Sequence, residues 1–311
     1  QQLSEKEGIA SSLLSIGRLK YNIGSISEGI AYGNRSLCYE QKDLSHKALD
    51  DLIQALETAK KYKEQKYIGI LYGSIAMNFH AQQEYQKAVE YHQQAIQVKR
   101  ELKNQHSLAI SYQNIALSYS KLKQYNLAFE YFQKAQSIFK EVGDKVGIAL
   151  SDHYSGLTYH ELYKNNFTTQ SENSIRSQQL LLDSAITLNK RALKQLQAID
   201  DQFYTMEVQI ELSNMLISAQ KSKEAQHLLN QIIQEVENSY DTRESSVTLA
   251  LYKVNKLQKN YTQALKWHER YTLIEDSINN KQVLKEIGKK QAELSFIKEQ
   301  EITQLKHQNE I

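Results

Sequence analysis

A forty-residue spacing of small and aromatic residues is the feature that most restricts the possible folds of this 311-residue chain. Four series follow this spacing: Ala48, Ala88, Ala128; Ala55, Ala95, Ala135; Tyr32, Tyr72, Tyr112; and Tyr39, Phe79, Tyr119. The two alanine series are seven residues apart, as are the two aromatic series, so each pair lies on one face of a helix. Each period therefore contains two helices. The small residues lie where two helices touch closely, and the aromatic residues fill the space between neighbouring pairs.

The helix-breaking residues are scarce, which supports the same conclusion. The chain has no proline and 11 glycines, whereas average usage of about 5% would place roughly fifteen prolines in a chain this long. Good helix formers fill long stretches instead. We therefore predict an all-α fold. Because a repeat array can grow without a second core, the number of domains cannot be inferred from the length of the chain alone.

The repeat resembles the tetratricopeptide motif, whose first helix carries large, small and aromatic positions and whose second helix carries two alanines seven residues apart. The best matches are Tyr72-x2-Ile75-Ala76-x2-Phe79 with Tyr85, Ala88 and Ala95, and Tyr112-x2-Ile115-Ala116-x2-Tyr119 with Tyr125, Ala128, Phe132 and Ala135. The period departs from the family value of about thirty-four residues, which fits longer helices. The resemblance implies a right-handed α-solenoid of about six helix–turn–helix repeats.

The spacing is interrupted once, because Ala185 follows Ala128 by 57 residues instead of forty. The insertion, at about residues 165–181, is rich in Asn, Ser, Thr and Gln, and we interpret it as an exposed loop or an extended helix end. It is either a tolerated surface insertion or a ligand-specific lid. The predicted organisation is an N-terminal cap or truncated repeat at 1–27, a solenoid at 28–275 and a C-terminal helix at 276–311.

The last segment carries a sparse but regular apolar seam made of Val283, Ile287, Leu294, Ile297, Ile302 and Leu305. Spacings of eleven residues along this seam describe a stutter better than unbroken heptads. A helix with so narrow a stripe is marginal alone, so it pairs with a second copy or folds back on the solenoid. We predict a coiled-coil-like helix and favour a parallel homodimer.

The run from Tyr271 to Asn280, followed by residues 299–305 and 309–311, resembles bacterial, Bacteroidetes-like tetratricopeptide sensor proteins. In those proteins a helical linker follows the solenoid, usually with a membrane span and then a histidine kinase, a nucleotide cyclase or a DNA-binding regulator. The resemblance implies a sensory region in the periplasm, with the membrane reached only through a segment after Ile311. A cytoplasmic location is the alternative.

No set of residues suggests catalysis, a cofactor or a metal. The nine histidines form no ligand set, and the sequence has no glycine-rich phosphate loop, no nucleophile elbow and only one cysteine, Cys38. With 38 basic and 36 acidic residues, the charge pattern of a nucleic-acid binder is also missing. We therefore expect a module that is not an enzyme and does not contact nucleic acid.

In the tetratricopeptide family the first helix of each pair forms a concave wall, and its side chains outside the core face a ligand. Carried over by position, the candidates are Asn34, Ser74, Met77, His80, Gln113, Asn114, Leu117, Ser120, His153, Tyr154 and His160, with Gly33, Leu37, Gly73 and Leu157 beside them. Asn34 and Asn114 occupy places where the family often uses an amide, which can donate and accept at once, to hold a peptide backbone. The Lys and Arg pattern of chaperone-type carboxylate clamps is missing, so we do not predict recognition of an acidic C-terminus. Ordinary surface residues without a dedicated ligand are the alternative.

The leading hypothesis is a sensory or interaction region of a bacterial signalling protein that binds a protein or peptide and relays its state through a dimeric C-terminal helix. The stutter motivates the relay, because two near-equal registers form a bistable element that a ligand can bias. A cytoplasmic peptide-responsive regulator resembling the quorum-sensing receptors and a plain assembly scaffold are the alternatives.

Overall fold

The computed structural model describes residues 45–165, 172–239 and 243–277. The predicted N-terminal segment 1–27, the candidate Asn34 and all six seam residues of the C-terminal helix lie outside these ranges. The chain forms two compact units, Gln1–Val208 and Gln209–Ile311. The two units are therefore described separately below.

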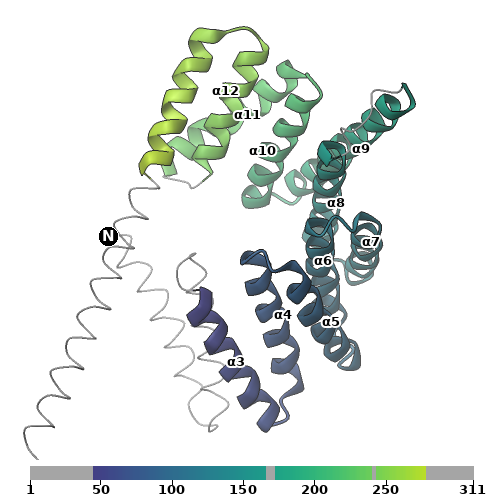
Figure 1. Ribbon diagram of the computed structural model, residues 1–311. Coiled ribbons are helices and arrows are strands. Elements are labelled where there is room, and N and C mark those ends of the chain that lie inside the picture. Colours follow the sequence, from purple (N-terminus) through teal and green to yellow (C-terminus); the bar gives the residue numbers. More distant parts are fainter. Residues whose placement is uncertain (1–44, 166–171, 240–242, 278–311) are drawn as a thin grey trace, which may run out of the picture. The chain divides into compact units, whose positions relative to one another are not determined.

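The described residues form helices joined by short turns, with no strand among them, so the predicted all-α fold is confirmed (Figure 1). The helices are α3 (Ser45–Lys61), α4 (Gln65–Ala81), α5 (Tyr85–Glu101), α6 (Gln105–Lys121), α7 (Tyr125–Val142), α8 (Lys145–Asn165), α9 (Glu172–Gln197), α10 (Gln202–Ser218), α11 (Ser222–Ser239) and α12 (Glu244–Leu257). A further helix occupies residues 261–277. None of these helices is both long enough and apolar enough to cross a membrane.

The forty-residue period consists of two twenty-residue units, each a helix followed by a short turn. A residue with positive φ ends each unit, and these residues recur every twenty positions: Lys63, Gln83, Lys103, Lys123 and Gly143. The next amide closes the helix on a carbonyl five residues back, as in Glu84 N to Phe79 O and Gln124 N to Tyr119 O, both 2.9 Å. This is the Schellman arrangement that ends many helices. The short turns make consecutive helices antiparallel neighbours.

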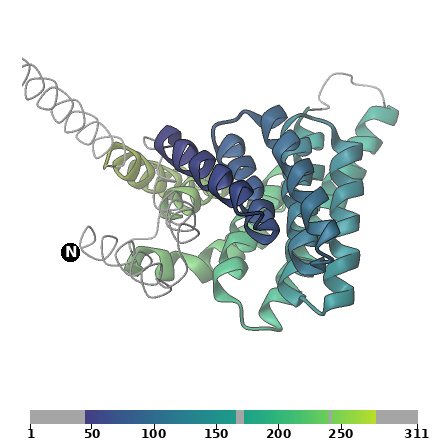
Figure 2. The same ribbon diagram turned by 90° about the horizontal axis from the view of Figure 1, so that it is seen from below.

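Within the first unit, each helix from α3 to α9 packs against the next (Figures 1 and 2). The first helices of successive pairs, α4, α6 and α8, also contact one another, whereas the described second helices α5 and α7 do not. The first helices therefore form one continuous layer, as the tetratricopeptide resemblance implies. We call the exposed surface of this layer the first-helix wall.

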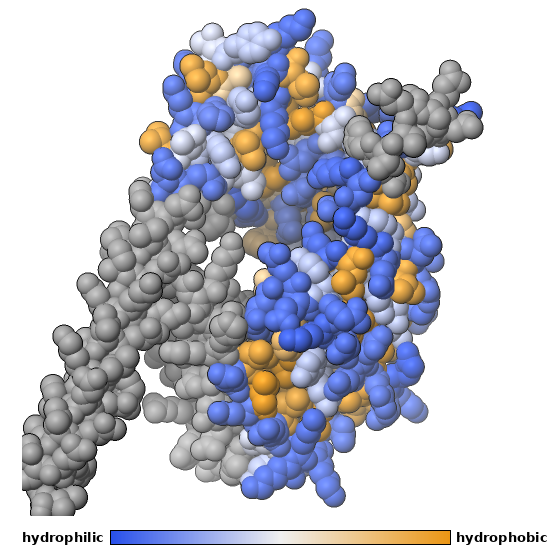
Figure 3. Space-filling model, in the orientation of Figure 1, coloured by the Kyte–Doolittle hydropathy of each residue, from blue (hydrophilic) through white to orange (hydrophobic). Residues whose placement is uncertain are grey.

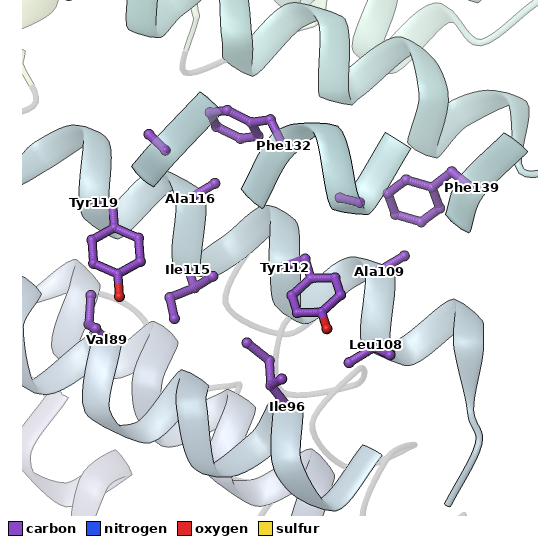
Figure 4. Close-up of a cluster of buried hydrophobic side chains, with 12 residues drawn as sticks. Val89, Ile96, Leu108, Ala109, Tyr112, Ile115, Ala116, Tyr119, Phe132 and Phe139 are labelled. Atoms are coloured by element: carbon purple, nitrogen blue, oxygen red, sulfur yellow. The ribbon is translucent and has the colours of Figure 1, made fainter. Parts of the chain in front are cut away.

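The alanine and aromatic series occupy the places that their spacing predicts. Ala88, Ala95, Ala128 and Ala135 have no exposed surface, which lets the two helices of each pair approach closely. Figure 4 shows how the aromatic rings of α6 lie between the second helices on either side, with Val89 and Ile96 on one side and Phe132 and Phe139 on the other. Tyr119 stacks on Tyr131 with a centroid distance of 5.5 Å. The core is thus continuous from one pair to the next.

The insertion of the sequence analysis mainly lengthens helices. α8 has 21 residues and α9 has 26, whereas α4, α5 and α6 have 17 each. Near the start of α9 the described side chains face solvent, and Leu180 is 61% exposed. Residues 166–171, between the two helices, lie outside the described ranges.

The second unit contains the end of α10, then α11, α12 and the helix over 261–277. Ala225 and Ile232 of α11 are buried seven residues apart and so continue the two alanine positions. The Gln209 side-chain amide donates to Gln231 Oε1 at 3.0 Å, which connects α10 with α11. Arg270 binds Glu244 at 2.6 Å and connects the last described helix with α12. Degenerate repeats therefore still form helix pairs here.

Candidate binding surface

The first-helix wall carries three rows of residues, each row formed by equivalent positions of α4, α6 and α8. We name them the first apolar row (Ile70 and Ile110, whose α8 equivalent Leu150 is buried), the polar row (Ser74, Asn114, Tyr154) and the second apolar row (Met77, Leu117, Leu157). Ile70 is 45% exposed, and Met77 and Ile110 are each 38% exposed. Apolar side chains thus reach the surface on α4 and α6. Figure 3 shows small groups of apolar residues among hydrophilic ones on the face that it draws. Two apolar rows flank a polar one on this surface.

A second set of predicted site residues lies between neighbouring first helices instead of on the wall. Each residue bonds to a partner 38 positions further along the chain. His80 Nδ1 lies 2.9 Å from Ser118 Oγ, the Gln113 amide donates to Ser151 Oγ at 3.3 Å, and the Ser120 and Thr158 hydroxyls are 3.1 Å apart. We call these contacts the polar ladder. Gln113 and Ser120 are consequently buried.

The hydroxyls of the polar ladder also bond to their own helix. Ser118 donates to Asn114 O at 3.3 Å, Ser151 to Gly147 O at 2.8 Å and Thr158 to Tyr154 O at 2.9 Å. Each hydroxyl has one hydrogen to donate, so Ser118 and Ser151 accept from the preceding first helix, whereas the Thr158 hydrogen lies between Tyr154 O and Ser120 Oγ. Donors and acceptors are therefore matched along the layer.

His153 continues this pattern at the lengthened helices. Asn189 Nδ2 donates to Ala185 O at 3.0 Å, so Asn189 Oδ1 faces His153 Nδ1 at 2.6 Å and accepts a hydrogen from it. His153 has no exposed surface, and burial lowers its pKa to about 4. Its Nε2 has no hydrogen-bond partner among the described residues and lies 3.9 Å from Glu207 Oε1.

Two further polar side chains of α8, His160 and Asp152, are buried. Burial, and then the charge of Lys164, lower the pKa of His160 to about 4. The buried Asp152 carboxylate accepts two hydrogen bonds from the Arg191 guanidinium and one from the Gln136 amide at 2.6 Å. Such a bidentate pair fixes α9 against α8 with defined geometry. These groups stabilise the fold around the insertion.

The structure therefore divides the predicted site residues into two groups. Ser74, Met77, Asn114, Leu117 and Tyr154 lie together on the first-helix wall. The others lie between helices or are enclosed by them: His80, Gln113, Ser120, His153 and His160. Asn34 lies outside the described residues.

Two exposed residues of the wall are absent from the sequence-based candidates. Ile70 and Ile110 precede Met77 and Leu117 by seven residues, so they share the same helix face. Extending the candidate face by two helical turns toward the N-terminus of each helix would have included both.

A buried lysine lies behind the wall and was also missed. Lys99 of α5 extends between α4 and α6, where its Nζ donates to Ser111 Oγ at 2.7 Å. Burial lowers the pKa of Lys99 to about 8. His92, on the same helix, has no exposed surface and no hydrogen-bond partner for either ring nitrogen in the described part of the chain. Burial, followed by the charges of His80 and Lys99, lowers the pKa of His92 to about 3.

Within the described ranges, no group of three or more His, Cys, Asp or Glu side chains is placed to hold a metal ion. The polar groups described above include amides, hydroxyls, imidazoles and the Lys99 ammonium. Such groups suit hydrogen bonding to a polar ligand.

A tetratricopeptide-repeat family model matches the sequence over residues 27–101 and again over 67–141. None of the curated proteins compared with the chain matches it. Among solved structures, the apo form of RapI is 14% identical with a TM-score of 0.60 and aligns over 86% of this chain and 90% of its own. These likenesses support the solenoid fold.

Two further solved structures share the fold. A Rap protein complexed with Competence and Sporulation Factor is 12% identical, with a TM-score of 0.59, over 84% of this chain and 78% of its own. A signal transduction ATPase with numerous domains from Pyrococcus horikoshii, which has a tetratricopeptide repeat sensor, is 13% identical with a TM-score of 0.65. The alignment covers 89% of this chain and 42% of that larger protein.

Proposed function

Because residues 27–141 belong to the tetratricopeptide-repeat family, we propose that the first-helix wall binds an extended peptide segment, either free or part of a partner protein. The observation that carries this proposal is the exposure of Ile70, Ile110 and Met77 on either side of the polar row. Exposed apolar side chains with a few polar groups among them are typical of sites that bind other molecules.

The chemistry of the three rows fits an extended backbone. An extended peptide directs alternate side chains to opposite sides of its backbone. The apolar rows can then receive side chains, while the Asn114 amide and the Ser74 hydroxyl both donate to and accept from peptide groups. The ladder beneath the wall holds these helices in a fixed register, which lowers the entropy cost of binding.

We further propose that the chain is the sensory part of a bacterial signalling protein. The neighbouring Rap structure contains a bound factor, and the pyrococcal neighbour contains a repeat sensor. The relay to an output through residues 276–311 rests on the apolar seam and on the sequence resemblance to sensor proteins. Single cysteines placed at Leu294 and Leu305 test the dimeric relay, and the absence of an inter-chain crosslink at both sites would contradict it.

Peptide binding can be tested with a random dodecapeptide library selected on the immobilised chain. Affinities of the selected peptides are then measured by calorimetry for the wild type, Met77→Glu and Leu127→Glu. Leu127 on α7 is the matched control, because it is 38% exposed, as Met77 is, but belongs to a second helix.

We expect Met77→Glu to weaken binding by about tenfold or more, because it places a charge in an apolar contact. Leu127→Glu should change it by less than about twofold. A selection that yields no binder, or binders that respond equally to both substitutions, would overturn the proposal.

A further inference from the structure

Lys99 occupies a position that is apolar in the other repeats. The equivalent residues of the other second helices are Ala59, Phe139, Leu196 and Val236, all of which are buried. An ammonium at a core position costs free energy that an apolar side chain would not. Its presence here requires a reason other than packing.

The ammonium lies beside Gly73, next to the wall. A Cβ added at Gly73 would lie 3.6 Å from Lys99 Nζ and within 4 Å of no other described side chain. Gly73 is partly exposed and adjoins Ser74 of the polar row. In the next two repeats the equivalent positions carry Gln113 and His153, which fill the corresponding place. Among α4, α6 and α8, α4 is the helix that has no side chain at this position.

The ammonium also has unused binding capacity. It has three hydrogens and donates one of them to Ser111 Oγ. Within the described part of the chain, Lys99 makes no ion pair with a carboxylate. His92, His80 and Lys121 are the other titratable groups nearby, and all of them are neutral or positive. The environment therefore lacks a negative charge.

We propose that Lys99 Nζ, reached through the space beside Gly73, binds a carboxylate of the peptide that lies on the first-helix wall. The inference rests on the proposed function and adds the class of ligand to it. It also revises the expectation that the chain lacks a Lys and Arg pattern for binding carboxylates. Here the cation comes from the second helix, at a position that sequence analysis assigns to the core.

The peptide library above provides the first test. Selected peptides should share an Asp or Glu at one position, or should lose affinity when their C-terminus is amidated, and these two results distinguish a side-chain carboxylate from a terminal one. Lys99→Met should lower the affinity for these peptides about tenfold, because it removes a charge-assisted hydrogen bond. It should remain folded, since the position is apolar elsewhere.

Two further variants make the test specific. Lys87→Met removes an exposed lysine from the same helix and should change affinity by less than about twofold. Gly73→Ala places a methyl group 3.6 Å from Nζ and should weaken carboxylate peptides while sparing their Glu→Gln or amidated versions. Peptides that bind the wild type and Lys99→Met equally would overturn the carboxylate site and leave the proposed function standing.

A second measurement does not depend on peptide binding. The chain is labelled with ¹³Cε-lysine, and the NMR signal of Lys99 is assigned by its loss in Lys99→Met. This signal is then followed during titration with sodium acetate, with sodium chloride as the control. We expect a saturable shift with acetate alone. A Lys99 signal that responds equally to both salts would overturn the site, whereas an acetate-specific shift without any peptide binder would uphold the site and contradict the proposed function.

Discussion

Asn189 lies directly against Gly156, so that a Cβ at residue 156 would come within 2.1 Å of the Asn189 Nδ2 atom and 3.0 Å of Ala185 O. Because the same amide orients His153, the side chain cannot move aside without losing its hydrogen bonds. We therefore expect Gly156→Ala to lower the free energy of unfolding by about 2–3 kcal/mol, measured by urea denaturation.

Gly73→Ala is the matched control for this substitution. It is also a glycine within a first helix, but its added methyl group would make only an ordinary contact at 3.6 Å. Alanine should raise the free energy of unfolding by about 0.5–1 kcal/mol there. Equal effects of the two substitutions would show that the contact with Asn189 is unimportant.

Breaking the Asp152–Arg191 ion pair should cost more unfolding free energy than breaking an exposed ion pair. Arg191→Met leaves the buried Asp152 carboxylate with Gln136 as its remaining described partner. Because the Arg191 side chain is itself 53% exposed, we expect a loss of about 1–3 kcal/mol, below the full cost of breaking a buried pair. Lys134→Met, which breaks an exposed pair with Glu130, should cost less than about 0.5 kcal/mol. Both values come from chemical denaturation, and a larger loss in Lys134→Met would contradict the prediction.

His92 predicts a substitution that stabilises the fold. The equivalent residues of the neighbouring repeats are Leu52 and Phe132, and His92 is fully buried without hydrogen bonds from the described residues. His92→Leu should raise the free energy of unfolding by about 1–3 kcal/mol at pH 7. The reverse change at the equivalent site, Leu52→His, should lower it. A destabilised His92→Leu variant would indicate that the imidazole has a partner in the native chain.

The same residue predicts how stability changes with pH. Because burial lowers the pKa of His92 from 6.5 to about 3, the unfolded chain binds more protons than the folded chain between these values. The free energy of unfolding is therefore unaffected by protonation of His92 above pH 6.5. It falls by about 1.4 kcal/mol for each pH unit as the pH drops from 6.5 toward 3. The stability advantage of His92→Leu over the wild type should therefore grow by roughly 2–3 kcal/mol between pH 7 and pH 4.5. If the difference in unfolding free energy between His92→Leu and the wild type stayed constant from pH 7 to pH 4.5, this prediction would be wrong.

The turns predict opposite effects for glycine at equivalent positions. Lys123 has a φ of 61° and Gly143 a φ of 75°, a conformation that costs a residue with a side chain about 1–2 kcal/mol. Lys123→Gly should raise the free energy of unfolding by about 0.5–1 kcal/mol, and Gly143→Ala should lower it by about 1 kcal/mol. Thermal or urea denaturation of both variants tests the pair, and effects of the same sign would contradict it.

The helices and their contacts followed from the sequence because the forty-residue spacing reports packing directly. Ala88 and Ala128, for example, are fully buried where the spacing places them. The wall was predicted less completely, because helical position alone does not say which of two adjacent faces meets the next helix. Ser74 and Gln113 were assigned to one surface, yet Gln113 turns toward Ser151.

Lys99 could not be predicted as a ligand contact for a related reason. Its position in the forty-residue period predicts a core residue. The sequence does not show that its ammonium lies next to Gly73, where no side chain separates it from the wall. The pairing of Asp152 with Arg191 depends on the lengths of α8 and α9, which no periodic pattern specifies.

The hydroxyls of the polar ladder make the junctions between first helices chemically alike on one side. Ser118 and Ser151 donate their hydrogen to their own helix and accept from the preceding helix, whereas the Thr158 hydroxyl lies within donating distance of both Tyr154 O and Ser120 Oγ. The partner on the preceding helix is an imidazole between α4 and α6, and an amide and a hydroxyl between α6 and α8. Because a hydroxyl can accept as well as donate, one kind of side chain serves all three partners, so the preceding helix can change its polar residue without redesign of the helix that follows.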